Sequence, residues 1–243
     1  MSSPTIVLLH GVGLDHTVWE PLIELLPNDF HAVAVDLPGH GARPPLGDGV
    51  TLADLAAGVV DAIPAGAHLV GFSLGALVAQ HLAIHRPDLV ATLTSVSSVC
   101  KRTPDERAAV LDRLRTAGDD FSASAAASLT RWYDGTEVDA ELVRRTEQTL
   151  LANDPASFLH AYRVFATADA EVAVDLHRIT VPALAVTGEN DPGSTPEMTR
   201  RLAAALPDCR AVIVPGARHM LPVERPAELA TCLTQFIGEY AHV

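Results

Sequence analysis

The chain has 243 residues, of which 48% are hydrophobic and 19% are charged, so it can fold as one domain with a sizeable core and is not expected to be disordered. Its formal net charge is -13. This excess of acidic groups argues against nucleic acid or an anionic membrane surface as a partner.

Two features indicate the compartment. Cys100, Cys209 and Cys232 lie far apart in the sequence, which does not suggest a disulfide framework and suits a reducing cytoplasm. The first apolar run, Thr5–Leu9, has no basic region before it, and no apolar run reaches the roughly 18 residues that span a bilayer. We therefore expect a cytoplasmic protein with no signal peptide and no membrane partner.

Short apolar runs alternate with helical patterns, which is typical of βαβ units. In chain order, we expect strands at Thr5–His10, Ala32–Asp36, His68–Phe72, Val90–Val96, Ala183–Thr187 and Ala211–Val214. We expect helices at His16–Leu26, Thr51–Ile63, Leu74–Arg86, Pro196–Ala205 and Pro226–Tyr240. Because the strands are apolar on both faces, the pattern predicts an α/β fold with a mainly parallel, doubly wound sheet.

The strand pattern stops between Lys101 and about Thr180. Four helical stretches replace it, at Pro104–Ala117, Ser122–Tyr133, Asp139–Ala152 and Pro155–Thr167. Glycine, proline and asparagine residues separate these stretches and provide stop and start signals. We expect residues 101–179 to form a helical cap inserted into an α/β core made of residues 1–100 and 180–243.

The main chemical motif is the G-x-S-x-G sequence of Gly71–Gly75 (GFSLG). It follows an expected strand and opens an expected helix, and this strand–turn–helix context is that of a nucleophile elbow. The turn strains the backbone of its serine, and the flanking glycines remove Cβ atoms that would clash. We predict that Ser73 is the nucleophile, at a helix N-terminus whose dipole favours negative charge. The alternative is a serine that only caps the helix.

A serine hydroxyl needs a base, and the base needs a partner to orient it. Asp191 and His219 lie in the loops after the last two expected strands. The carboxyl ends of parallel strands share one edge of the sheet, where Ser73 also lies. We therefore predict His219 as the general base and Asp191 as its orienting carboxylate. Of the competing acids, Glu189 lies too near its strand end and Asp208 precedes the last strand.

An oxyanion formed during acyl transfer needs hydrogen-bond donors. The first expected strand ends in the sequence His10–Gly13 (HGVG), whose glycines allow backbone N–H groups to turn inward. We predict an oxyanion hole formed by the N–H groups of Val12 and Leu74, the latter being the residue after the nucleophile. His10 itself is expected to support this loop by hydrogen bonding.

Other chemistries find little support in the sequence. No H-E-x-x-H motif, clustered Cys and His ligands or nucleotide-binding glycine motif is present, so we expect neither a metal nor a cofactor. A serine instead of an aspartate at position 73 argues against the ester-forming carboxylate of haloalkane dehalogenases and epoxide hydrolases.

With these motifs in place, the chain resembles the α/β-hydrolase superfamily over essentially its whole length. Within it, the chain resembles the 3-oxoadipate enol-lactonases and their aminoacrylate-hydrolase-like relatives. This resemblance is carried by Ser128–Tyr133 (SLTRWY), Arg145–Pro155 (RTEQTLLANDP) and Ile179–Leu184 (ITVPAL).

The sequence also departs from these families. Members of the superfamily begin with an antiparallel hairpin, whereas only Met1–Pro4 precede the first expected strand here. We therefore expect the hairpin to be missing and the strand Ala32–Asp36 to be a sheet edge. Leu37-Pro38 stands where enol-lactonases carry an arginine, and Arg218 replaces the usual small residue before the catalytic histidine.

The resemblance and the motifs together predict hydrolysis of a carboxylic ester or lactone through an acyl-enzyme. The best candidate is an enol-lactone of a small carboxylic acid. A C–C bond hydrolase of ring-cleavage products uses the same triad and stays open, as does a hydrolase-fold receptor without turnover. The sequence also leaves a homo-oligomer open.

Such an enol-lactone carries a free carboxylate, which is costly to bury unpaired and which a guanidinium binds with two parallel hydrogen bonds. Arg131 in the expected cap is the first candidate for this contact, with Trp132 as a wall of the site. Arg163 is the second candidate. The alternative for both arginines is a solvated position on a helix.

Overall fold

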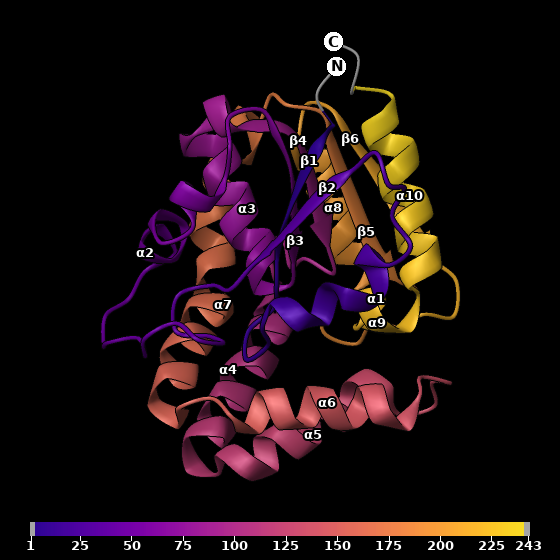
Figure 1. Cartoon of the computed structure of the whole chain (residues 1–243). Coiled ribbons are helices and arrows are strands. Elements are labelled where there is room, and N and C mark those ends of the chain that lie inside the picture. Colours follow the sequence, from indigo (N-terminus) through magenta and orange to yellow (C-terminus); the bar gives the residue numbers. More distant parts are fainter. Residues whose placement is uncertain (1–2, 241–243) are drawn as a thin grey trace.

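The computed structural model describes residues 3–240 and contains a six-stranded sheet in the order β2-β1-β3-β4-β5-β6, in which every neighbouring pair is parallel (Figure 1). The strands are β1 (Thr5–Leu9), β2 (His31–Val35), β3 (Ala67–Phe72), β4 (Val90–Val96), β5 (Ala183–Gly188) and β6 (Cys209–Val214). The parallel sheet is confirmed, and β2 lies at its edge as predicted. The outermost residues of the expected core, 1–2 and 241–243, lie outside the described residues.

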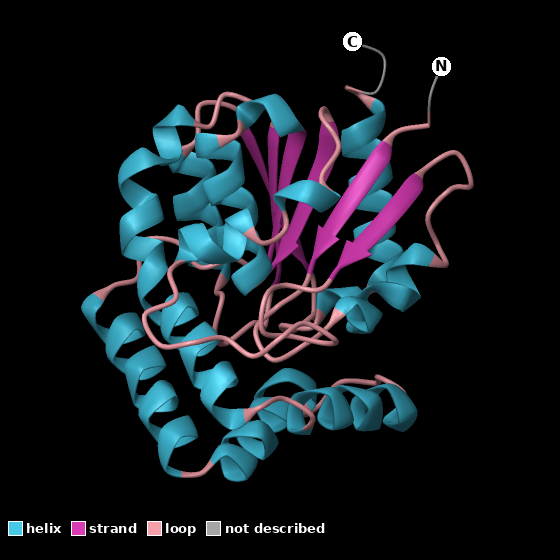
Figure 2. Cartoon of the chain, turned by 60° about the vertical axis from the view of Figure 1, so that its left-hand side comes forward, coloured by secondary structure: helices cyan, strands magenta, loops and turns pink. Residues whose placement is uncertain are grey.

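Helices cover both faces of the sheet, which makes the fold doubly wound (Figure 2). One face packs against α2 (Leu52–Ala57), α3 (Leu74–His85) and α8 (Pro196–Ala205). The other face packs against α1 (Glu20–Ile23), α9 (Leu221–Glu224) and α10 (Pro226–Gly238). Successive residues of β1 alternate between the two cores: Val7 belongs to the first and Leu8 to the second. This alternation explains why the strands are apolar without interruption.

Four further helices lie beyond the carboxyl ends of the strands, and the last of them runs back to pack beside α3 (Figures 1 and 2). These cap helices are α4 (Pro104–Asp119), α5 (Phe121–Tyr133), α6 (Ala140–Leu151) and α7 (Pro155–Asp175). Each begins after a residue whose side chain accepts a backbone N–H of the first turn, namely Thr103, Asp120, Asp139 and Asp154. These capping residues give the helices well-defined starts. Within residues 3–240, no helix is both long and apolar enough to cross a membrane.

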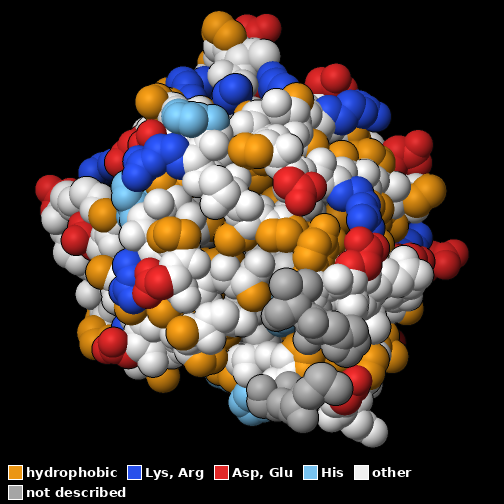
Figure 3. Space-filling model, turned by 90° about the horizontal axis from the view of Figure 1, so that it is seen from above, with side chains coloured by type: hydrophobic (Ala, Val, Ile, Leu, Met, Phe, Trp, Pro, Cys, Tyr) orange, Lys and Arg blue, Asp and Glu red, His pale blue; other side chains and the backbone are white. Residues whose placement is uncertain are grey.

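The start of β1 and the end of α10 lie at the opposite end of the sheet from α5 and α6 (Figure 1). Figure 3 views this end and shows acidic and basic side chains interspersed, so this face carries no large patch of a single sign.

Several helix boundaries differ from the prediction. The stretch His16–Leu26 is a 3-10 turn at His16–Trp19 followed by α1, because Pro21 has no N–H to continue the earlier turn. The predicted helix Thr51–Ile63 ends at Ala57, since Gly58 follows. α7 continues past the predicted end at Thr167 to Asp175, and the four-residue α9 was not predicted because it is too short to show periodicity.

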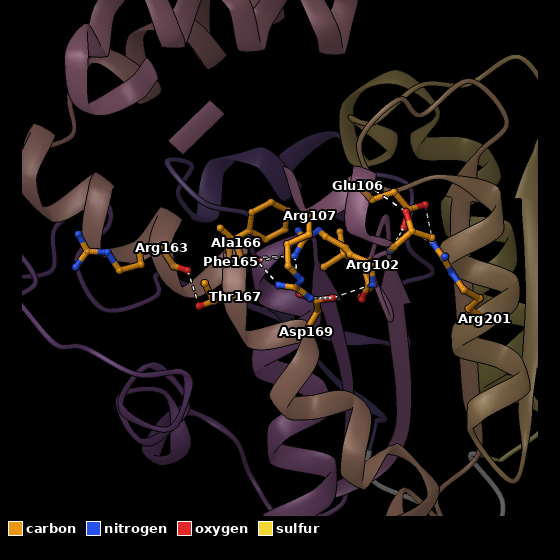
Figure 4. A network of polar contacts seen from close by, with 12 residues as sticks. Arg102, Glu106, Arg107, Arg163, Phe165, Ala166, Thr167, Asp169 and Arg201 are labelled. Atoms are coloured by element: carbon orange, nitrogen blue, oxygen red, sulfur yellow. Dashed lines mark hydrogen bonds and ion pairs between the residues drawn. The ribbon is translucent and has the colours of Figure 1, made fainter. Parts of the chain in front are cut away.

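A buried ion-pair network joins the first and last cap helices (Figure 4). The Asp169 side chain of α7 is 0% exposed and accepts hydrogen bonds from Arg102 Nη1 at 2.8 Å and from the Arg102 backbone N–H at 3.0 Å. Arg107 Nη2 lies 3.1 Å from both oxygens of the same carboxylate. Arg201 of α8 reaches Glu106 on the other side of α4 at 2.8 Å. The start of α4 is therefore fixed to α7 and to the core helix α8.

We expect Asp169→Asn to lower the free energy of unfolding by about 3–5 kcal/mol, because it leaves the buried Arg102 guanidinium without its counter-charge. The control is Asp112→Asn, since Asp112 pairs with Arg115 at a site where both side chains are about two-thirds exposed, and its cost should stay below about 1 kcal/mol. Urea titrations of both variants measure the difference. Equal losses in the two variants would contradict a structural role for the network.

Candidate active site

Ser73 occupies a sharp turn between β3 and α3. Its backbone has φ 53° and ψ -110°, a conformation that residues with side chains rarely adopt. Its N–H donates to the carbonyl of Val96 at 2.9 Å, which ties the turn to β4. A Cβ on Gly71 would lie 2.2 Å from the carbonyl oxygen of Gly75, and a Cβ on Gly75 would lie 2.2 Å from the oxygen of Leu9. Both glycines are therefore required for the chain to make this turn.

His219 and Asp191 form a buried hydrogen-bonded pair. His219 Nδ1 lies 2.7 Å from Asp191 Oδ2, and the two side chains are 8% and 0% exposed. Asp191 Oδ1 accepts the backbone N–H groups of Gly193 at 2.9 Å and Ser194 at 2.8 Å. With the Nδ1–H of His219 donating a hydrogen bond to this carboxylate, the Nε2 atom carries no proton and can act as a base. No hydrogen bond joins Ser73 to His219 within residues 3–240, and such contacts commonly tighten only when substrate binds.

The loop that carries His219 is held on two sides. Ser97 at the end of β4 donates its Oγ to the His219 carbonyl at 3.1 Å. Arg218 reaches in the opposite direction, from Nη1 to the carbonyl of Asp134 at 2.6 Å and from Nε to the carbonyl of Arg131 at 3.2 Å. These carbonyls end helix α5, so Arg218 caps that helix and joins it to the histidine loop.

The two predicted oxyanion donors lie in neighbouring loops. Leu74 is the first residue of α3, where the backbone N–H has no acceptor inside the helix. Val12 lies in the loop after β1 and lines the same cavity as Ser73. Neither N–H donates to another group among the described residues. Both are therefore free to bind an oxyanion.

His10 supports the loop that contains Val12 through hydrogen bonds of its ring. Its Nε2 accepts the backbone N–H of Leu37 at 2.9 Å, and its Nδ1 lies 2.8 Å from the carbonyl of Gly11. These contacts require a neutral ring with the proton on Nδ1. Burial lowers the pKa of His10 to about 3, so the ring stays neutral at physiological pH. His10 has the supporting role that the sequence predicted.

The cap also contacts this loop. Asn153, between α6 and α7, donates from Nδ2 to the carbonyl of Gly13 at 2.9 Å. Gly13 has φ 74°, and a Cβ there would lie 2.7 Å from the ring of Phe158 and 2.8 Å from Leu150. The cap helices therefore pack directly on the loop that contains Val12.

A single cavity brings the core and the cap residues together. The core contributes Ser73, Asp191 and His219, and the cap contributes a largely apolar wall. The cavity is lined by Val12, Ser73, Arg113, Phe121, Ala125, Ser128, Arg131, Trp132, Leu150, Phe158, Tyr162, Phe165, Asp191, Pro192, Gly193, Ser194 and His219. The ring of Trp132 stacks on that of His219, with centroids 5.8 Å apart and an angle of 23° between the planes.

The predicted substrate-binding arginines lie in different environments. Arg131 lines the cavity and donates to Ser128 Oγ at 2.7 Å, and burial lowers the pKa of its guanidinium. Arg163 does not line the cavity. Its side chain is 60% exposed, pairs with Asp48 at 3.3 Å and points away from the Asp169 network (Figure 4). We therefore leave Arg163 out of the proposed substrate site.

Sequence reasoning missed Arg113, which also lines the cavity from α4. A signal for it was present, because Arg113 lies three residues after Val110 and four before Ala117, the two buried residues of this helix. A charged residue on the buried stripe of a helix indicates a special environment. No three His, Cys, Asp or Glu residues among those described are placed to hold a metal ion.

The sequence also matches a known protein family. A family model described as "Alpha/beta hydrolase family" matches residues 6–231. The chain belongs to the alpha/beta hydrolase family. A match over almost the whole chain, together with hydrolases among its relatives, identifies it as a hydrolase enzyme.

Three relatives illustrate the similarity. The (E)-2-((N-methylformamido)methylene)succinate hydrolase of Acinetobacter baylyi is 31% identical over 228 residues, which cover 92% of this chain and 86% of that protein. The pimeloyl-(acyl-carrier protein) methyl ester esterase of Yersinia pseudotuberculosis is 30% identical and covers 96% of this chain and 93% of its own length. The crystal structure of the enol-lactonase from Burkholderia xenovorans superposes with a TM-score of 0.86 at 26% identity, covering 98% of this chain and 92% of that one.

We expect Arg218→Gln to lower kcat/KM by roughly 10- to 100-fold, because α5 and its Trp132 lose their fixed position over His219. Arg218→Lys should recover part of the loss, since an ammonium group can still donate to one carbonyl. The kcat/KM values of the wild type and both variants are measured from the hydrolysis of a neutral p-nitrophenyl ester.

The matched control is Arg210→Gln, which removes an exposed arginine paired with Glu239 at 2.9 Å. It should leave kcat/KM unchanged. Wild-type kcat/KM in Arg218→Gln would show that the contact with α5 does not position the histidine.

Proposed function

We propose that this hydrolase cleaves a carboxylic ester or lactone through an acyl-enzyme on Ser73, with an enol-lactone of a small carboxylic acid as the best candidate substrate. The observation that carries the proposal is the strained turn that holds Ser73 in the same cavity as His219, whose Nδ1 is bonded to Asp191.

In the first half-reaction, Ser73 Oγ attacks the acyl carbon and its proton passes to His219 Nε2. The negative oxygen of the tetrahedral intermediate accepts the N–H groups of Val12 and Leu74, and each such donor contributes about 10²–10³ in kcat. Asp191 stabilises the imidazolium. His219 then gives the proton to the leaving oxygen, and the bond to that oxygen breaks.

In the second half-reaction, water attacks the acyl carbon while His219 Nε2 takes its proton. The proton returns to Ser73 Oγ as the acyl bond breaks, which releases the carboxylic acid. For an enol-lactone, the released enol stays on the same molecule, so the product is one open-chain acid. Every proton moves between substrate, water and the side chains of Ser73 and His219, so the proposed mechanism needs no cofactor.

Two further features support an ester or lactone with an anionic group. Arg131 presents a guanidinium to the cavity beside Trp132, within a cap wall that is largely apolar, and this suits a substrate carboxylate. The names of similar proteins include a methyl ester esterase and an enol-lactonase, and a third is a hydrolase of a succinate derivative.

We expect Ser73→Ala to lower kcat by several orders of magnitude and to leave the melting temperature near that of the wild type. Intact-mass spectrometry of the wild type, mixed with a panel of lactones, esters and a vinylogous diketone, should detect an acyl adduct that Ser73→Ala lacks. Mutant activity within tenfold of the wild type would remove Ser73 from the mechanism. Turnover of the diketone alone would favour C–C bond hydrolysis, and turnover of none of the panel would favour a receptor.

The acid of the triad is tested by a matched pair of variants. Asp191→Asn should lower kcat by about 10⁴, because an asparagine no longer holds the histidine in the correct tautomer. Glu189→Gln should have little effect, since Glu189 accepts the N–H of Gly216 at 2.9 Å and not that of His219. The reverse pattern in steady-state kinetics would show that the acid is Glu189.

A further inference from the structure

Two arginines from different cap helices line the active-site cavity without an acidic partner. Arg113 comes from α4 and Arg131 from α5. Neither forms an ion pair with any residue in the range 3–240, and the Arg131 side chain donates a hydrogen bond only to the neutral Ser128 hydroxyl. This is unexpected in a chain with 30 acidic and 17 basic residues.

The other arginines of the same helix show the contrast. Arg107 binds the buried Asp169 carboxylate, and Arg115 pairs with Asp112 at 2.9 Å and Asp119 at 3.0 Å. The arginine between them, Arg113, faces the cavity and has no such partner. Arg107 and Arg115 of α4 therefore have acidic partners, whereas Arg113, at the point where the helix lines the cavity, has none among the described residues.

The surroundings make these two charges costly to leave unpaired. The rings of Phe121, Phe158, Tyr162 and Phe165 line the same cavity. Burial lowers the pKa of Arg131; the nearby Tyr162 partly offsets this effect, and the positive charge of Arg113 adds to it. The one carboxylate that lines the cavity, Asp191, is occupied by His219, Gly193 and Ser194. A bound anion is the remaining source of compensation.

We propose that Arg113 and Arg131 form a dicarboxylate site, so that the substrate keeps two free carboxylates in addition to the acyl group that Ser73 attacks. Each guanidinium can bind one carboxylate through two parallel hydrogen bonds, so two arginines match two carboxylates. The proposal rests on the proposed function, and it narrows the substrate class from an anionic ester or lactone to a dianionic one.

Binding is tested apart from turnover. In Ser73→Ala protein, titration calorimetry with glutarate and with butyrate compares a dicarboxylate with a monocarboxylate of similar size. We expect glutarate to bind at least tenfold more tightly, and we expect Arg113→Gln and Arg131→Gln each to reduce this preference roughly tenfold. Arg113→Lys keeps the positive charge but cannot donate two parallel hydrogen bonds, so this variant should lose only part of the preference for glutarate. If Arg113→Gln does not fold, Arg113→Lys takes its place in the test.

The control is Arg115→Gln, which changes an exposed arginine on the same helix and should leave the preference unchanged. Equal weakening of glutarate and butyrate by Arg113→Gln would show that both arginines bind one carboxylate, and no preference in the parent protein would remove the dicarboxylate site. Either result overturns the proposal.

Kinetics give a second readout. Wild-type kcat/KM should be higher for the mono-p-nitrophenyl ester of propane-1,2,3-tricarboxylic acid, which has two free carboxylates, than for p-nitrophenyl hemisuccinate, which has one. Hydrolysis of neutral p-nitrophenyl acetate by the wild type, and its loss in Ser73→Ala, reports on the hydrolase chemistry alone. If the wild type cleaves the acetate but shows no preference between the two anionic esters, the proposed function stands and the dicarboxylate site is ruled out.

Discussion

The active site depends on one close approach of backbone to backbone. Gly75 at the start of α3 passes so near to the end of β1 that a Cβ would lie 2.2 Å from the Leu9 oxygen and 2.6 Å from that of His10. This contact sets the nucleophile turn beside the loop that begins at His10. Since Val12 lies in that loop and Leu74 follows Ser73, the same contact brings together the two N–H groups that we propose as oxyanion donors. The strained backbone of Ser73 is held by this packing and by its hydrogen bond to Val96.

The cap helices add a second constraint, because they touch each part of this machinery. Asn153 bonds to the oxyanion loop at Gly13, and Arg218 bonds the end of α5 to the histidine loop. The buried Asp169 carboxylate fixes α4 to α7 at the base of the cap. The core thus carries the groups that we propose for bond cleavage, while the cap lines the cavity and contacts the loops of Gly13 and His219. A change in the cap would therefore affect kcat as well as KM.

Much of this arrangement could be predicted from the sequence, because it follows from local patterns. Buried strands give continuous apolar runs, and parallel strands deliver the loops of Ser73, Asp191 and His219 to one edge of the sheet. Contacts between distant segments gave no such signal. The bonds from Arg218 to α5 join residues 84 and 87 positions apart, and the sequence showed only that an arginine stood in an unusual place. Arg131 and Arg163 look alike in the sequence, yet only the fold turns one toward the cavity and the other toward solvent.

The net charge of -13 bears on how an anionic substrate reaches this site. An acidic protein repels anions at long range, but at physiological ionic strength the field of surface charges fades over about 8 Å. Inside the cavity, apolar rings form much of the wall, so charges there are screened less than charges on the surface. Repulsion outside and attraction inside favour small anions that fit the cavity over large polyanions such as nucleic acids. The acidic surface and the two arginines of the proposed dicarboxylate site are therefore compatible, because they act at different distances.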